Sequence, residues 1–445
     1  RLLFHMSLIS EQSISKSPFL IDAVKVLLIK EEILDLKFNK VVFYGDNIKL
    51  SNCIRELCEE LNINYKLVFK KNTKTTFKKF LYKNIILSSV LIFFKTCIKV
   101  LPFLLNKDSI NNTYKSDVFI MSYMTNFSFK NKFQSNYWGP LLSLLSKKKY
   151  SINMFNIFIK NEQTPTPFQG INLIKKLNYS QIQNKYFYIE NFLQWLDIFR
   201  IFKIFFLNQF KFRGMIKKII YENKNSKNNW FLSLATDDLY NSFIGSYSIF
   251  NLYHIFYFKN CFSNISKQKL GLYLWENQSW ERALVYYWNK NNHGKLYGVM
   301  HYCPRFWDLR MLNLKLDYEI NSIKDDLYPY KYTIIGKEFY KLFRSADIKE
   351  RDFVPVEALR YFHLIKRKKQ KKRNKNFPLK ALILLDIYYK SSKSLLIDID
   401  KNFFLLKKYF KLSIKFHPAN KFNLSFIRNA SFGIENKSIS EALQS

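Results

Sequence analysis

From about residue 41 onward, short apolar runs alternate with segments whose apolar residues have helical spacing. Residues 41–44 form an apolar run that Gly45 and Asp46 end as a turn, and apolar positions at helical spacing follow over 48–61. A second apolar run lies at 65–69. This order predicts a strand, a helix and a second strand, which together form a βαβ unit.

The same pattern continues along the chain. An apolar run at 117–121 leads into a polar, aromatic loop, a short helix is predicted at 141–145, and a further strand lies within 150–159. Later apolar runs at 270–275 and 295–300 also predict strands. Strands that alternate with helices form parallel sheets with helices on both faces. We therefore expect an α/β, Rossmann-like fold.

A basic run at 366–375, followed by Pro378, interrupts this pattern. Runs of like charge are usually solvated linkers. Beyond it, the pattern predicts a buried strand at 379–387, a helix to 409 and a strand at 412–416, which is a new βαβ start. We predict an N-terminal domain at 1–361, a basic linker at 362–378 and a second Rossmann-like domain at 379–445.

The two ends of the chain suggest a piece of a longer protein. Residue 1 is an arginine, and the last residues, 440–445, break off inside a helix-like pattern. We therefore expect the second domain to be truncated.

Two segments are unusually apolar. Residues 85–105 are interrupted by Lys95, Lys99 and Pro102, well short of the ~20 clean residues that a membrane span needs. Residues 192–210 are almost entirely aromatic or aliphatic, with a thin polar stripe. Such a helix is either deeply buried or lies in a membrane interface. Each segment alone favours burial, but two of them on a basic chain fit interfacial docking equally well.

The charge changes this picture only in part. The chain has 72 basic and 34 acidic residues, a net charge of +38. Such a charge normally indicates a polyanionic partner, but here Lys and Asn are abundant along the whole chain, which indicates a general composition bias. The five cysteines include no Cys-x-x-Cys pair, and no signal peptide is visible. We expect a cytoplasmic protein, peripheral on the inner face of the plasma membrane.

The most informative block is 270–283, where a buried strand ends in Glu276 and a helix begins at once. We expect Asn277 or Ser279 to cap this helix, and Glu281 and Arg282 to form an architectural ion pair within it. In open α/β sheets, ligands bind beyond the carboxyl ends of the strands. Glu276 is therefore a candidate catalytic residue, although a purely structural carboxylate fits the sequence as well.

A second strand end carries polar groups. His301 follows the strand at 295–300, and the loop after it is rich in cationic, aromatic and acidic side chains. Such a cluster is unusual for a solvated turn. We therefore take His301 as a second candidate catalytic residue, and we interpret these loop residues as lining the acceptor site or cleft: Arg305, Trp307, Asp308 and Arg310.

Two further segments complete the candidate site. Lys415 and His417 stand at the end of the strand at 412–416, with Pro418 fixing the turn, and residues 436–442 resemble a helix start that bears Ser438 and Ser440. An imidazole and a helix N-terminus both suit a phosphate. The loop after residue 121 contributes polar and aromatic side chains that could hold a sugar ring or pack among themselves: Tyr123, Ser135, Tyr137 and Trp138.

Metal ligands are not expected. Asp398 and Asp400 form an Asp-x-Asp, but they lie in a helical pattern, where residues two apart face different directions. The six histidines have no metal-ligand spacing. We predict no metal and no cofactor.

Five short blocks carry a resemblance to a known family. They are 274–283 (Leu-Trp-Glu-Asn-Gln-Ser-Trp-Glu-Arg-Ala), 293–295, 298–301, 306–310 (Phe-Trp-Asp-Leu-Arg) and 356–361. Together they resemble a bacterial family of surface carbohydrate biosynthesis glycosyltransferases, whose members look like GT-B enzymes. The resemblance implies two Rossmann-like domains facing a cleft, with a nucleotide-sugar donor on the C-terminal domain and a glycan or lipid-linked acceptor on the N-terminal one.

A more distant likeness concerns His417 and Pro418 followed by a serine-bearing helix start. These are similar to motifs of sialyltransferases and Kdo transferases that use CMP-sugars, although Met300 and Lys437 depart from the usual pattern. The likeness implies that His417, Ser438 and Ser440 contact the donor's phosphate and that Glu276 is the base. We also expect Lys415 and Pro418, beside His417, to line the donor site. Two alternatives stay open: a basic nucleic-acid-binding protein, which lacks a recognisable motif here, and a non-catalytic GT-B-like scaffold.

Overall fold

The computed structural model describes residues 1–69, 85–107, 116–125, 127–129, 133–180, 184–223, 229–303, 308–311, 327–345, 353–364, 378–386, 388–417 and 423–436. The chain divides into two compact units, Arg1–Ile365 and Lys366–Ser445. The basic run at 366–375 lies outside the described residues.

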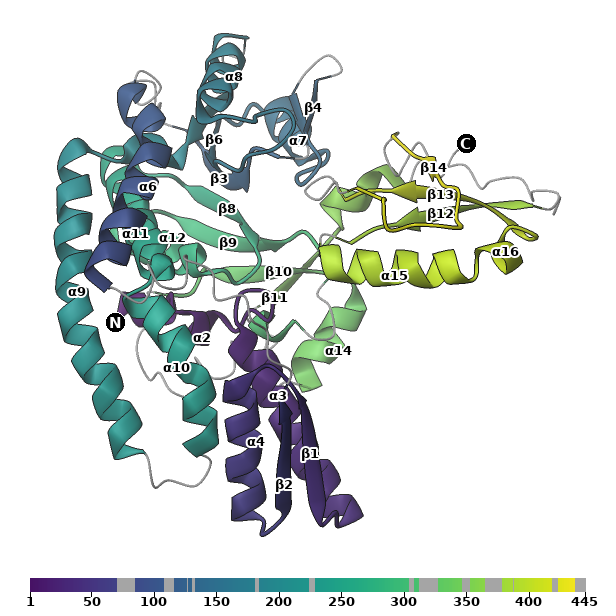
Figure 1. Cartoon of the computed structure of the whole chain (residues 1–445). Coiled ribbons are helices and arrows are strands. Elements are labelled where there is room, and N and C mark those ends of the chain that lie inside the picture. Colours follow the sequence, from purple (N-terminus) through teal and green to yellow (C-terminus); the bar gives the residue numbers. More distant parts are fainter. Residues whose placement is uncertain are drawn as a thin grey trace. The chain divides into compact units, whose positions relative to one another are not determined.

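The first unit is built on a seven-stranded parallel sheet (Figure 1). Its strand order is β11-β10-β9-β8-β3-β6-β7, with every neighbouring pair parallel. The strands are β3 (Val118–Tyr123), β6 (Ile152–Ile157), β7 (Asn184–Tyr188), β8 (Leu270–Trp275), β9 (Lys295–Met300), β10 (Lys331–Ile335) and β11 (Phe353–Val356).

This strand order reverses beside β3. The chain runs outward through β6 and β7, then returns to the other side of β3 to add β8, β9, β10 and β11. A doubly wound sheet of this order has its topological switch point between the two central strands, and ligands bind outside the carboxyl ends there. The fold is compatible with a Rossmann-like α/β architecture and places Tyr123 and Glu276 at that point.

Helices enclose the sheet, so β3 and β6 are buried along their whole length, as apolar parallel strands require. The fused core contains Phe119, Phe155 and Trp288, with Phe119 stacked on Phe155 at 4.8 Å between ring centroids. The helices are α1 (Leu2–His5), α2 (Leu8–Glu11), α7 (Leu141–Lys147), α8 (Pro167–Ser180), η2 (Ile189–Phe192), α10 (Asn229–Phe243), α11 (Ser246–Asn264), α12 (Ser279–Lys290), η3 (Leu309–Met311), α14 (Lys337–Ser345) and η5 (Leu359–Leu364). A small hairpin, β4 (Phe127–Phe129) and β5 (Phe133–Ser135), follows β3.

The predicted first βαβ unit forms, but it does not join the main sheet. β1 (Lys40–Gly45), α4 (Ile48–Glu60) and β2 (Asn64–Phe69) make a separate two-stranded parallel sheet beside α3 (Pro18–Leu36) (Figure 1, purple). Burial along β1 alternates with exposure, unlike β3, because α4 covers one face and packs on Trp230 and Leu234 of α10. The sequence pattern did not distinguish these two strands from those of the main sheet.

The two apolar segments are helices that lie on the outside of this unit. α6 (Ile85–Leu105) and α9 (Trp195–Glu222) contact each other through Phe93 and Phe202, whose ring centroids are 4.6 Å apart. Gln194 and Asp197 form a capping box that begins α9. Among the described residues, no helix has both the length and the apolar character to cross a bilayer.

The second unit contains the predicted new βαβ start. β12 (Leu379–Leu384), α15 (Tyr389–Lys401), α16 (Phe403–Leu406) and β13 (Phe410–Lys415) lead to β14 (Gly433–Ile434) in a three-stranded parallel sheet. Asp398 and Asp400 do lie on one helix, α15. Asp400 accepts N–H bonds from residues 428–430, so it anchors a loop.

Candidate active site

The junction between β8 and α12 sets the position of Glu276. β8 ends at Trp275, and Asn277 adopts the left-handed backbone conformation (φ 56°), which turns the chain sharply into α12. The N-cap is Gln278, not Asn277 or Ser279 as predicted, and its side chain forms a capping box with Glu281. Glu276 is left on the two-residue turn at the carboxyl edge of the sheet.

Glu276 meets His301 across neighbouring strand ends. β8 pairs with β9 in a register that sets Trp275 opposite Met300, so the residue after each strand reaches the same edge. His301 Nε2 lies 3.0 Å from Glu276 Oε1, and Arg310 Nη1 lies 3.8 Å from Glu276 Oε2. Gln278 donates a hydrogen bond to Glu276 and lies 3.3 Å from the hydroxyl of Tyr123.

These contacts keep Glu276 ionised. Burial alone would raise the pKa of this carboxyl, because its side chain is only 22% exposed. The hydrogen bond and charge of His301, then Gln278 and Arg310, outweigh burial and lower the pKa below its ordinary value. Glu276 is therefore an anion that faces a partly open site.

Arg310 is held in place by Asp308. The guanidinium donates from Nε and Nη2 to the two carboxylate oxygens of Asp308, at 2.8 and 2.7 Å, and Tyr302 bonds the same carboxylate at 3.2 Å. Burial alone would lower the pKa of Arg310, but Asp308 outweighs it and raises that pKa above its ordinary value. This bidentate pair fixes a permanent positive charge beside Glu276.

Glu281 has a different role from Glu276. It is buried at the start of α12 and accepts backbone N–H bonds from residues 276, 277 and 278. Burial raises the pKa of Glu281 to about 8, with these donors acting in the opposite direction. Arg282 bonds the side chain of Asn277 and the carbonyl of Leu327. Both residues hold the architecture, but through caps and loop contacts instead of the ion pair that we expected between them.

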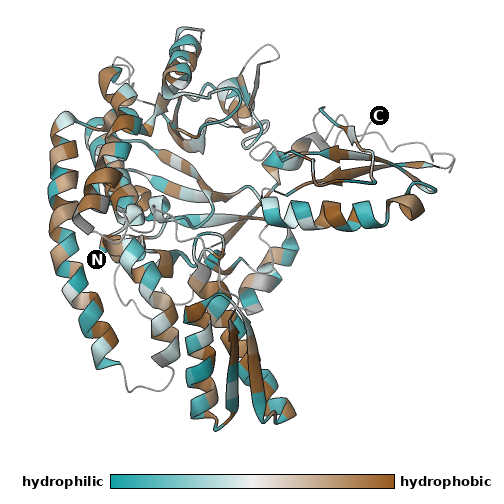
Figure 2. Cartoon of the chain, in the orientation of Figure 1, coloured by the Kyte–Doolittle hydropathy of each residue, from teal (hydrophilic) through white to brown (hydrophobic). Residues whose placement is uncertain are grey.

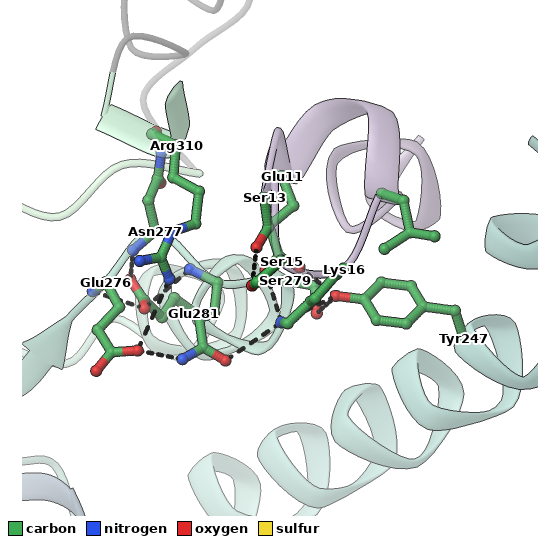
Figure 3. Close-up of polar contacts among 12 residues, drawn as sticks. Glu11, Ser13, Ser15, Lys16, Tyr247, Glu276, Asn277, Ser279, Glu281 and Arg310 are labelled. Carbon is green, nitrogen blue, oxygen red and sulfur yellow. Dashed lines mark hydrogen bonds and ion pairs between the residues drawn. The ribbon is translucent and has the colours of Figure 1, made fainter. Parts of the chain in front are cut away.

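A polar network from the N-terminal segment supports the site, and the sequence did not reveal it (Figure 3). Lys16 forms an ion pair with Glu11 at 2.6 Å, and its Nζ lies 3.5 Å from Gln278 Oε1. Tyr247 donates to Glu11 and lies 3.2 Å from the Ser279 hydroxyl. The contacts of Lys16 with Gln278 and of Tyr247 with Glu11 join residues more than 200 positions apart, so no local pattern could have identified them.

The predicted aromatic loop contributes unequally. Tyr123 lies at the end of β3, and the ring of Tyr137 packs edge-on to His301 with 5.3 Å between centroids. Trp138 is completely buried and donates from Nε1 to the hydroxyl of Ser122, and Ser135 is also buried. In this structure Trp138 and Ser135 belong to the interior, without a surface free to stack on a sugar, whereas Tyr137 lies against the site.

The remaining predicted residues lie in the second unit or outside the described residues. Lys415 and His417 belong to the second unit, at the end of β13, where Lys415 Nζ lies 3.5 Å from the Glu435 carbonyl oxygen. Arg305, Trp307, Pro418, Ser438 and Ser440 lie outside the described residues.

No cluster of three or more His, Cys, Asp or Glu side chains that could hold a metal ion occurs within the described ranges. Glu276, His301 and Arg310 can present an ionised carboxylate, an imidazole and a fixed guanidinium to a ligand at the switch point. Comparison with protein-family models, curated proteins and solved structures finds no match to this chain.

Proposed function

We propose that this protein is a glycosyltransferase of GT-B type that transfers a sugar from a nucleotide-sugar to a surface glycan or lipid-linked acceptor. One observation carries the proposal: Glu276 and His301, from adjacent strands, share a hydrogen bond at the carboxyl edge of a doubly wound sheet. This is where such sheets bind ligands, and perturbed carboxylates cluster at functional sites.

The chemistry follows from the protonation states. An acceptor hydroxyl oxygen attacks the anomeric carbon of the sugar while the bond from that carbon to the nucleotide phosphate breaks, and the phosphate leaves with the electron pair. The hydroxyl proton passes to the Glu276 carboxylate, which is ionised and hydrogen-bonded to His301. The sequence resemblance assigns the donor phosphate to His417, Ser438 and Ser440 of the second unit.

The site favours catalysis over a scaffold role. A scaffold gains little from gathering Glu276, His301, Asp308 and Arg310 at one strand edge, because removing charges from water is costly even when they are paired. A nucleic-acid-binding role would rest on the net charge of +38, which is spread along the chain and marks no surface.

The test is sugar transfer from a panel of CMP-, UDP- and GDP-sugars to membrane glycan extracts. Glu276→Gln should lower kcat by about 10²–10⁴-fold, because the amide cannot take the proton. Glu338→Gln, on an exposed carboxylate of α14, is the matched control and should leave kcat unchanged. Thermal unfolding should show that both variants fold. Full turnover by Glu276→Gln, or no binding of any nucleotide in a titration, would reject the proposal.

A further inference from the structure

A large cavity lies in the first unit beside the candidate active site. It has a volume of about 1090 Å³ and is enclosed by α6, α9, α10 and α11 together with the residues that follow β6 and β7. Its walls are mainly apolar and aromatic, including Phe103, Ile249 and Tyr253. A space of this size is large enough for a small-molecule ligand.

Three buried polar atoms in the cavity wall have no hydrogen-bond partner among the described residues. Glu190 is 7% exposed and His254 is 3% exposed, and both line the cavity. Glu190 Oε2, His254 Nε2 and Arg213 Nε are buried and make no hydrogen bond within the part of the chain that the structure describes. Because buried polar atoms are almost always hydrogen-bonded, these three indicate a polar ligand.

Some of the charged side chains that line the cavity have a partner within the protein, and others do not. Lys16 is bound to Glu11, Asp237 to Lys49 and Asp238 to Ser17. By contrast Lys95 and Lys99 of α6 and Arg213 of α9 have no ion pair among the described residues. Cations that line a cavity without counter-charges favour an anionic group.

Two side chains connect the cavity wall to the candidate carboxylate. Lys16 lines it, and Lys16 Nζ lies 3.5 Å from Oε1 of Gln278, whose amide donates to Glu276. The cavity wall and the candidate base therefore belong to one hydrogen-bonded network.

An exposed apolar stripe runs along α6 next to the cavity. Its residues recur every three or four positions, so they lie on one face of the helix: Leu87, Leu91, Phe94, Ile98, Leu101 and Leu105. Ile98 is 71% exposed. Lys95 and Lys99 each follow a stripe residue by one position, about 100° around the helix. They therefore lie between the stripe and the cavity-lining Thr96 and Phe103.

The neighbouring helix α9 presents a similar face, and Figure 2 shows apolar residues along both helices. Its exposed apolar side chains include Trp195, Leu196, Phe199, Leu207 and Phe210. Arg200 and Lys211 lie beside this face and Lys203 lies within it, whereas Asp197 is buried and Glu222 ends the helix. An apolar face with basic flanks matches the surface of an anionic bilayer.

We propose that this cavity binds an anionic amphiphile that enters from a membrane surface between α6 and α9. The phosphate or other anionic group lies on Lys95, Lys99 and Arg213, and the hydrocarbon lies against α6 and α9. Resting on the proposed function, the inference identifies this amphiphile as the sugar acceptor, with its polar end directed through the cavity toward Glu276.

Isothermal titration calorimetry on the full chain measures the binding of decyl phosphate, which is kept below its critical micelle concentration. The triple variant K95Q/K99Q/R213Q should weaken binding by about tenfold or more, since it removes three charge-assisted contacts. The matched control K147Q/K148Q/K149Q removes three exposed charges after α7 and should bind as the parent does. T96W fills the cavity from α6 without changing charge and should also abolish binding.

Two soluble probes test separately how much the anionic group and the hydrocarbon chain contribute to binding. Decyl maltoside lacks the anion and inorganic phosphate lacks the chain, so both should bind at least about tenfold more weakly than decyl phosphate. Equal affinity for either probe, or unchanged binding by T96W or by K95Q/K99Q/R213Q, would overturn the proposal.

Sedimentation with lipid vesicles tests whether the protein takes the amphiphile from a membrane surface. The protein should bind phosphatidylglycerol vesicles and not phosphatidylcholine vesicles, and F94S/F199S should weaken that binding by about tenfold or more. The control L28S/L34S changes two equally exposed leucines on α3, which also carries Asp22, Glu31, Glu32 and Asp35, and should have no effect. A dimer that F94S/F199S dissociates, without vesicle binding, would assign the face to a second copy and overturn the proposal.

Glu276→Gln separates this inference from the proposed function. It should lose sugar transfer and keep decyl phosphate binding. If the parent chain transfers no sugar but binds decyl phosphate through the cavity, the transferase proposal fails and the amphiphile site stands.

Discussion

Two polar regions lie at the same edge of the main sheet, on opposite sides of β3. Around Glu276, beyond β8 and β9, both carboxyl oxygens have partners, and the pKa is lowered. Around Glu190, beyond β6 and β7, one oxygen accepts from the backbone N–H of Phe158 at 2.9 Å, the other is unpaired in the described structure, and burial raises the pKa to about 7. The two pKa values shift in opposite directions because an imidazole and a guanidinium lie against Glu276, whereas Glu190 is more deeply buried and has only backbone donors beside it.

This difference separates two kinds of site. A carboxylate that its neighbours keep ionised is preorganised to take a proton, whereas one that is close to neutral can donate or accept a hydrogen bond when a ligand arrives. The first region is suited to chemistry and the second to binding.

The largest expected effect comes from removing the imidazole beside Glu276, so that its carboxyl, like that of Glu190, has no imidazole against it. His301→Leu removes the strongest partner that lowers the pKa of Glu276. That pKa should rise, so the acidic limb of the pH–rate profile, which reports the ionised base, should move to higher pH. We expect kcat/KM for sugar transfer to fall by about 10²-fold or more at pH 7.

His301→Gln is the informative companion, because its amide can still donate to Glu276. It should recover part of the activity and move the acidic limb back toward the parent position. An unshifted limb in His301→Leu would show that His301 does not control the charge of Glu276.

The second effect is on stability and comes from Glu190. Its pKa in the folded protein, about 7, is above its ordinary value of 4.5, so the folded state binds more protons and loses stability as pH rises between these values. Glu190→Gln keeps the bond to Phe158 and removes the ionisation. It should raise the free energy of unfolding by up to about 3 kcal/mol at pH 8.

Urea unfolding of the parent and Glu190→Gln at pH 4 and pH 8 measures this effect. The two proteins should have nearly equal stability at pH 4, where both carry a neutral group. A variant that is less stable than the parent at pH 8 would contradict the assignment of a destabilising buried carboxylate.

The sequence predicted the local parts of the first region. The apolar runs that became β8 and β9 end at Trp275 and Met300, so the rule that parallel strands share a carboxyl edge brought Glu276 and His301 together. The cap was missed because glutamine is not a preferred N-cap residue, and only the capping box with Glu281 explains Gln278.

Long-range features could not be predicted in this way. The apolar runs at β1 and β2 look like those of the main sheet, and only packing on Trp230 shows that they form a separate sheet. The cavity likewise depends on helices that are distant in sequence, and Glu190 has no motif around it. The expected contact of His417 with the donor phosphate stays a prediction.

The smallest effect concerns Gln278, which links the two regions by lying between Glu276 and the cavity residue Lys16. Gln278→Ala removes the N-cap of α12 and should lower the free energy of unfolding by about 1 kcal/mol. It also removes one donor from Glu276, so the acidic limb should shift upward, but by less than in His301→Leu because Gln278 is the weaker of the two contributors. Gln134→Ala, on an exposed position of β5, is the control and should change neither quantity. A stability loss without any shift of the limb would make Gln278 a cap alone, and the two regions would then act independently.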